Sequence, residues 1–150
     1  MERRAALLAV RPQLAEALLC GKKGVEFRRV RLPLSPGDLV YVYSISPVQA
    51  VIGSFACGEI TEAKPTTLWR KYASIAGVSR TALMEYFQGA ERGCAIIVCK
   101  PHRWNPPLTL AQIKRRIPDF TPPQSYLLIK HGDPLARVIA RFLLSGARKA

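Results

Sequence analysis

One ten-residue segment near the start of the chain is the most informative about its architecture: Gly21-Lys22-Lys23-Gly24-Val25-Glu26-Phe27-Arg28-Arg29-Val30. It follows a predicted short helix over residues 12–20 and enters a predicted strand over residues 24–30. Side chains alternate between the two faces of an extended strand. Glu26 and Arg28 therefore share one face, whereas Phe27 lies on the other and can pack. Core packing alone does not require two charged side chains on one face, so the pattern indicates a polar concave site.

This segment resembles the signature of ASCH domains, a branch of the PUA-like superfold. The signature is Gly, any residue, Lys, any two residues, Glu, any residue and Arg, at a junction between helix and strand. Here it falls on Gly21, Lys23, Glu26 and Arg28 without a gap. The order of the flanking elements also agrees, and the resemblance extends over about residues 5–128. It implies an α+β fold in which a small, bent PUA-like β-barrel is flanked by short helices.

Hydrophobic periodicity gives the rest of the organisation. Strands are predicted over residues 5–10, 39–45, 48–60, 93–99 and 126–129, and short helices over 66–72, 80–88 and 110–117. Gly53 and Gly58 interrupt the third of these strands, as expected where a small barrel bends. Trp104-Asn105-Pro106-Pro107 is predicted to be a turn or loop.

The last part of the chain is predicted to be an added amphipathic helix. Asp133 and Pro134 mark its start, and Leu135, Val138 and Ile139 recur at helical spacing. We therefore expect one domain over residues 1–130 and a C-terminal helix within residues 131–150 that packs on the same domain. Dimerisation through the apolar stripe is the alternative, and a monomer is the favoured expectation.

The charge balance predicts an anionic partner. The 23 Lys and Arg residues oppose ten acidic residues, which gives a formal net charge of +13. Such an excess on a small domain favours RNA or nucleotide binding, with DNA a further possibility. No apolar run is long enough to span a membrane, and the basic residues are spread along the chain, so no membrane partner is expected.

The resemblance to ASCH domains implies a cleft beside the barrel that is lined by Lys23, Glu26 and Arg28. Lys23 and Arg28 would contact phosphate or a base edge, and Glu26 would accept from an exocyclic amine or orient Arg28. The alternative is a Glu–Arg pair that only satisfies itself. Further candidate contacts are Lys22, Ser44, Gln124 and Ser125; for the last two, a plain turn is the alternative.

Trp104 is a candidate platform for a stacked base. It follows His102 and Arg103 in a polar, proline-flanked segment, and an aromatic ring beside a cation is a common way to hold single-stranded bases. The alternative for Trp104 is core packing. For Phe27 and Trp69, core packing is the expected arrangement.

Catalysis is left open by the sequence. The ASCH branch of N4-acetylcytidine amidohydrolases uses a lysine, a threonine and a glutamate; Lys23 matches the lysine, but Glu26 replaces the threonine and the glutamate position falls near Ala76. That hydrolysis is therefore not expected. RNA cleavage by Glu26 with Lys23, or with His102, remains an alternative to simple binding. A third alternative is a transcription-related protein-interaction module that uses the C-terminal helix.

The cysteines predict neither disulfides nor a metal centre. Cys20, Cys57, Cys94 and Cys99 each fall inside an apolar element, which is typical of reduced thiols in a cytoplasmic protein. Cys94 and Cys99 are an odd number of residues apart, so an unbroken strand directs them to opposite faces, away from a shared metal. We expect no metal and no cofactor.

Overall fold

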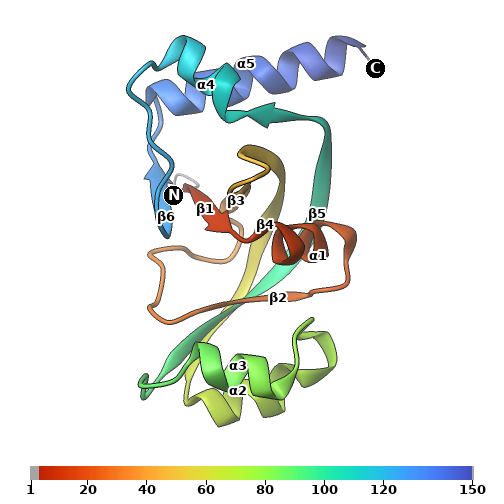
Figure 1. Ribbon diagram of the computed structural model, residues 1–150, viewed down its shortest axis with the longest axis vertical. Helices are drawn as coiled ribbons and strands as arrows, with labels where there is room; N and C mark the ends of the chain where they lie inside the picture. Colours follow the sequence, from red (N-terminus) through yellow and green to blue (C-terminus); the bar gives the residue numbers. More distant parts are fainter. Residues whose placement is uncertain (1–3, 150) are drawn as a thin grey trace.

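The computed structural model describes residues 4–149 and has a strongly bent, six-stranded mixed sheet at its centre (Figure 1). The strand order is β2-β5-β4-β3-β1-β6, and only β1 and β3 pair in parallel. The predicted α+β class and barrel-like sheet are confirmed. The elements are β1 (Ala5–Val10), α1 (Pro12–Cys20), β2 (Val25–Arg28), β3 (Leu39–Ser44), β4 (Ala50–Ala63), α2 (Pro65–Tyr72), η1 (Ala73–Ile75), α3 (Arg80–Tyr86), β5 (Gly93–Thr109), α4 (Leu110–Arg116), β6 (Tyr126–Ile129) and α5 (Pro134–Lys149).

The alternation of side chains along β3 explains why the sheet has a core on each face. Val40 and Val42 are buried in a cluster that includes α1 residues, whereas Tyr43 is buried in a second cluster with residues of α4 and α5. Because successive side chains point to opposite faces, one strand serves both clusters. The central strands are therefore apolar on both sides.

Strands β4 and β5 are long and bend together. Their register shifts between Val51 and Gly53, between Ser54 and Ala56, and between Cys57 and Ile60. At Gly53 the two backbones come so close that a Cβ atom would lie 2.4 Å from the carbonyl oxygen of His102. Gly53 thus allows the close approach that the bend requires, as the sequence predicted.

The course of β5 differs from the prediction. The strand runs through residues 104–107, which were predicted to form a turn or loop, and it ends only at Thr109. Two register shifts and the positive φ of Lys100 (48°) break its regularity. A bent strand of this kind has no simple alternation of apolar and polar residues, so its second half resembles a loop in the sequence.

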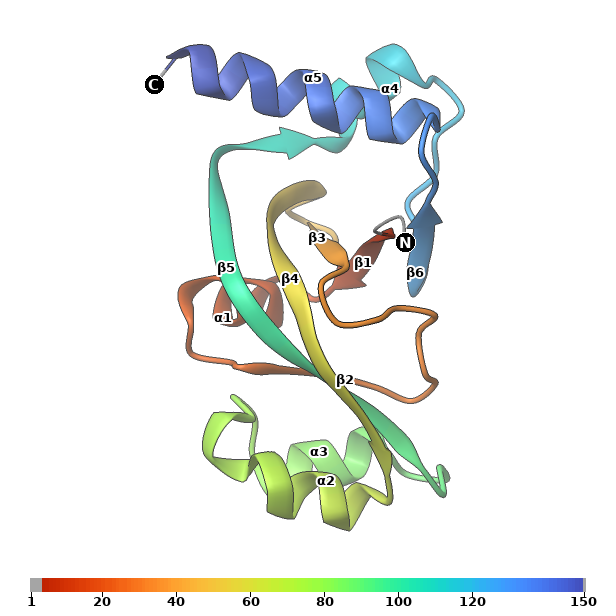
Figure 2. The ribbon, with the colours of Figure 1, turned by 180° about the vertical axis from the view of Figure 1, so that it is seen from behind.

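Helices α2 and α3 lie at one end of the sheet and α4 and α5 at the other, whereas α1 lies beside its middle (Figure 2). At one end, α2, η1 and α3 cover a third cluster with Phe27, Leu68 and Phe87. The hydroxyl of Ser79 accepts from the Ala82 backbone N–H and caps α3, as predicted. At the other end, Thr109 and Gln112 form a reciprocal capping box at the start of α4.

Helix α5 lies against the end of the sheet formed by the second half of β5. Leu135 and Ile139 are buried in the second cluster with Trp104 and Leu108. The centroids of the Phe142 and Trp104 rings are 5.5 Å apart. Trp104 is consequently only 5% exposed. The prediction that Trp104 has an exposed face for stacking is wrong, because α5 covers the ring.

The predicted domain (residues 1–130) and the predicted C-terminal helix (within residues 131–150) include residues 1–3 and 150, which lie outside the described residues.

The four cysteines are free thiols in different environments. Cys20, at the end of α1, is exposed, unlike the apolar setting predicted for it, whereas Cys57 and Cys94 are buried. Burial, with a smaller contribution from Asp38, raises the pKa of Cys57 to about 11, and burial also raises the pKa of Cys94. Both thiols are therefore almost fully protonated at neutral pH.

We expect iodoacetamide near neutral pH to alkylate Cys20 well before Cys57 and Cys94, because the thiolate is the reactive form and burial blocks access. Peptide mass spectrometry after timed quenching measures the rates, and a sample unfolded in urea is the control in which the rates should converge. Equal rates in the native protein would contradict the described burial.

Candidate functional site

The signature segment crosses from α1 to β2 through a tight turn. Gly21 ends the helix with a φ of 87°, a left-handed conformation that glycine adopts without strain. β2 then pairs antiparallel with the first half of β5, with Glu26 opposite Ile96. The strand comprises Val25–Arg28, shorter than the predicted residues 24–30 but including both charged signature positions.

Glu26 and Arg28 form an ion pair that is almost enclosed. The Arg28 Nη2 atom lies 2.8 Å from Glu26 Oε2, and the Arg28 Nε atom donates to the same oxygen at 3.0 Å. Their side chains are 12% and 6% exposed, respectively. This is the shared strand face that the sequence predicted, and the pair satisfies much of the polar capacity of both side chains.

The Arg28 guanidinium also joins β2 to two other parts of the fold. Its Nη2 atom donates to the carbonyl oxygen of Ala9 at 3.1 Å, near the end of β1. Its Nη1 atom donates to the carbonyl oxygen and the hydroxyl of Ser125, at 3.4 and 3.3 Å, just before β6. Arg28 therefore connects β2, at one edge of the sheet, to β1 and to the residue before β6, at the opposite edge.

Lys23 is buried, with only 2% of its surface exposed, which leaves too little of the side chain accessible for a direct contact with phosphate. Its Nζ atom donates to the carbonyl oxygen of Ala76 at 2.7 Å and lies 4.8 Å from the centre of the Phe27 ring. Ala76 is the position near which the amidohydrolase branch would place its glutamate. The structure puts that position beside Lys23, but alanine supplies no carboxylate there.

The pKa of Lys23 is lowered from its usual value of 10.5 by burial, against a smaller opposing effect of Glu26. Between the lowered pKa and 10.5, the unfolded chain binds more protons than the folded protein. Lys23 therefore makes the free energy of unfolding rise as the pH increases through that window.

We expect the difference in stability between wild type and Lys23→Met to grow in favour of wild type as the pH rises toward about 10.5, and to level off above it. Urea unfolding of both proteins across this range measures the difference. Lys22→Met, at the exposed neighbouring lysine, should show no such trend. A difference that is flat or falls with pH would contradict the lowered pKa of Lys23.

A cleft of about 730 Å³ opens beside these residues, between α1, β2, α3 and the loop after β3. Three cationic side chains, Arg11, Lys23 and Arg28, and one carboxylate, Glu26, line it. The other lining residues are Ala9, Val10, Pro12, Gln13, Leu14, Phe27, Ile45, Ser46, Pro47, Val78, Ala82, Leu83 and Tyr86. Its volume is in the range of pockets that take a small ligand or part of a larger one.

The structure brings together some of the predicted site residues and separates others. Lys23, Glu26 and Arg28 line the cleft. The other five predicted residues do not line it, although Ser125 accepts a hydrogen bond from Arg28. Lys22 and Gln124 are exposed, Ser44 is 1% exposed with a hydroxyl that has no hydrogen-bond partner within residues 4–149, and Trp104 lines a different hollow.

Two residues of the cleft, Arg11 and Tyr86, were not predicted from the sequence. Arg11 immediately precedes α1, is exposed, and has no ion pair within the part of the chain that the structure describes. Tyr86, on α3, is 39% exposed and donates its hydroxyl to the carbonyl oxygen of Phe27 at 3.2 Å. The Arg-Pro start of α1 was the available signal for Arg11. No sequence signal indicated Tyr86, because it comes from a helix that is distant in sequence from the signature segment.

Within residues 4–149, no three His, Cys, Asp or Glu side chains are grouped so that they could hold a metal ion. No helix in the same range combines the length and apolar character needed to cross a bilayer.

Comparison with known proteins places this geometry in a family. No protein-family model matches the chain. The chain is, however, 35% identical over 125 residues to an ASCH domain-containing ribonuclease of Zymomonas mobilis, and the match covers 83% of each protein. The crystal structure of ASCH from Zymomonas mobilis superposes with a TM-score of 0.84 and 29% identity, covering 93% of this chain and 96% of the other.

A more distant likeness supports the fold alone. A hypothetical protein from Leishmania major matches with a TM-score of 0.58 at 16% identity, over 99% of this chain and 97% of the other. The extent of the Zymomonas mobilis matches, together with the signature residues gathered at one cleft, shows that the chain belongs to the ASCH-domain family.

Proposed function

We propose that this protein binds single-stranded RNA in the cleft between α1, β2 and α3. The observation that carries the proposal is the 35% identity to an ASCH domain-containing ribonuclease. The lining of the cleft agrees with an anionic ligand, because it contains three cationic side chains and one carboxylate. The net charge of +13 would also attract a polyanion over longer distances.

The proposed roles follow from the exposure of each side chain. Arg11 is the exposed cation and contacts a phosphate. The Glu26–Arg28 pair, held rigid by Ala9 and Ser125, presents a fixed polar edge to a base or ribose. Lys23 lies too deep for direct contact and contributes positive charge beneath the cleft, where the low dielectric weakens screening.

The proposal predicts that Arg11→Gln weakens binding of a fluorescently labelled RNA oligonucleotide by about fivefold at 0.1 M salt, the effect of losing one phosphate contact to a single strand. Fluorescence anisotropy measures the affinity. Lys22→Gln is the matched control, because Lys22 is also exposed but does not line the cleft. Equal losses in both variants would indicate binding by diffuse charge and contradict a defined site.

RNA cleavage is a second candidate function, favoured by the activity named for the Zymomonas mobilis relative. Cleavage through the ribose 2′-hydroxyl needs a base to remove its proton and an acid to protonate the leaving oxygen. Glu26 is the carboxylate that lines the cleft, whereas His102 lines the other hollow. Glu26 is therefore the residue proposed to act as base. Because Lys23 lies too deep to reach the leaving oxygen, that oxygen would take its proton from water.

Incubation of labelled RNA with purified wild type, Glu26→Gln and Lys22→Gln separates cleavage from binding. Cleavage by wild type and Lys22→Gln, with loss in Glu26→Gln, is the result that supports an enzyme. If Glu26→Gln still cleaves RNA, Glu26 is not the base. Retained cleavage is also the result that a copurifying nuclease would give.

A further inference from the structure

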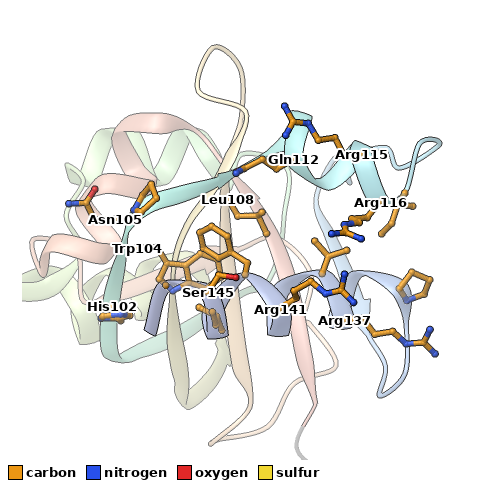
Figure 3. Close-up of a pocket in the computed structure, with 17 residues that line it drawn as sticks. His102, Trp104, Asn105, Leu108, Gln112, Arg115, Arg116, Arg137, Arg141 and Ser145 are labelled. Carbon is orange, nitrogen blue, oxygen red and sulfur yellow. The ribbon is translucent and has the colours of Figure 1, made fainter. Parts of the chain in front are cut away.

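A second hollow, of about 800 Å³, lies at the opposite end of the sheet between the end of β5, α4 and α5 (Figure 3). Its apolar wall includes Trp104, Leu108 and Phe142. Four arginines also line it: Arg115 and Arg116 come from α4, and Arg137 and Arg141 come from α5. None of the signature residues takes part, so this hollow is separate from the cleft.

The positive charge around this hollow is not compensated. All four arginines are exposed, and none forms an ion pair within residues 4–149. Among the residues that the structure describes, no Asp or Glu lines the hollow. Asp133 precedes α5, but its carboxylate accepts from the Lys130 backbone N–H at 2.8 Å and caps that turn. Four unpaired cations beside an apolar wall favour an anion, because the low-dielectric wall strengthens the attraction.

The arrangement of the cations fits a chain of phosphates better than one compact anion. Arg137 and Arg141 are one helical turn apart, a rise of about 6 Å, and the other pair projects from a separate helix. Figure 3 shows Arg116 and Arg141 on the same side of the hollow, with His102 and Asn105 toward the other end. The polar groups are therefore spread along the hollow.

We infer that this hollow, called here the arginine groove, is a second RNA-binding surface that holds phosphates of a strand outside the signature cleft. The inference rests on the proposed function for the identity of the polyanion, but on separate residues for the site. Trp104 is buried and its ring packs against those of Tyr41 and Phe142, so it forms part of the apolar wall and does not stack on bases. The arginine groove thus supplies affinity through phosphates, without base recognition.

The test compares Arg137→Gln/Arg141→Gln with Lys64→Gln/Arg70→Gln, which removes the same charge from exposed residues at the α2 end of the protein. For a single-stranded RNA 20-mer, losing two phosphate contacts should weaken binding about 25-fold at 0.1 M salt and reduce the slope of log affinity against log salt by about 1.4. The control pair should change affinity only slightly. A tetranucleotide, too short to occupy both surfaces, should bind both double variants equally.

Arg115→Gln/Arg116→Gln on the other helix should reproduce the loss, and unchanged melting temperatures would show that the variants are folded. If wild type binds the 20-mer but the groove and control variants weaken equally, the arginine groove is wrong and the cleft proposal stands. If wild type binds no RNA, both fail. Binding to vesicles that contain anionic lipid is measured for the same variants. If the groove variant loses vesicle binding but binds RNA as well as the control variant does, the surface binds a membrane and the inference is wrong.

Discussion

Glu26→Ala should lower the free energy of unfolding by about 3 kcal/mol, because it leaves the Arg28 guanidinium nearly enclosed without its carboxylate partner. Arg28 is 12% exposed and also donates to Ala9 and Ser125, so the loss would weaken contacts between three strands. Lys23, buried 2.7 Å from the Ala76 carbonyl oxygen, would lose its neighbouring negative charge as well. Urea unfolding followed by circular dichroism measures the change.

The matched control is Glu59→Ala, which removes the carboxylate of the exposed Lys71–Glu59 pair. Exposed pairs contribute little, so its unfolding curve should coincide with that of wild type. The double variant Glu26→Ala/Arg28→Met should be less destabilised than the sum of its single variants, because it removes both charges of the pair. Coincidence of the Glu26→Ala and Glu59→Ala curves would show that the Glu26–Arg28 pair has no structural role.

Gly53→Ala should destabilise the protein by about 3 kcal/mol, near the upper end of typical overpacking. The new Cβ atom would lie 2.4 Å from the His102 carbonyl oxygen and 2.6 Å from Leu19 Cδ1. The Leu19 side chain can turn away, but the backbone of β5 can yield only if the bend between β4 and β5 opens. Thermal unfolding measures the loss.

Gly146→Ala is the corresponding control, because nothing lies within 4 Å of a Cβ atom there. Alanine is favoured over glycine inside a helix, so this substitution should raise stability slightly. If Gly53→Ala were as stable as wild type, β4 and β5 would not approach each other as closely as described.

The sequence predicted the strands that have one clear periodicity or an uninterrupted apolar run. The bounds of β1, α1 and β6 agree with the structure, and the position of Gly53 correctly indicated a bend. The shared face of Glu26 and Arg28 also followed from strand alternation alone, because two residues on the same strand need no knowledge of the rest of the fold.

Features that depend on contacts distant in sequence were not predictable in this way. Trp104 looked exposed because its neighbours are polar, yet α5 covers it from more than thirty residues further along the chain. Lys23 was expected to contact phosphate or a base edge in the cleft, but the segment that carries Ala76 and Gly77 closes over it. A polar sequence neighbourhood indicates exposure only where no later element packs on the residue.

The two cationic surfaces illustrate the same limit. Arg11 and the four arginines of the arginine groove carry no local pattern that separates them from other basic residues. What distinguishes them is that the fold places them around hollows without giving them acidic partners. Net charge predicted an anionic partner for the whole chain, whereas the position of the unpaired charges determines where that partner is proposed to bind.

The proposal that RNA occupies the signature cleft can be tested by titrating ¹⁵N-labelled protein with a single-stranded RNA tetranucleotide at low salt and following the amide resonances. The amide signals of Arg11, Tyr86 and the segment from Lys23 to Arg28 are expected to shift together and to saturate. Shifts confined to α4 and α5, or no shifts anywhere, would contradict RNA binding at the cleft.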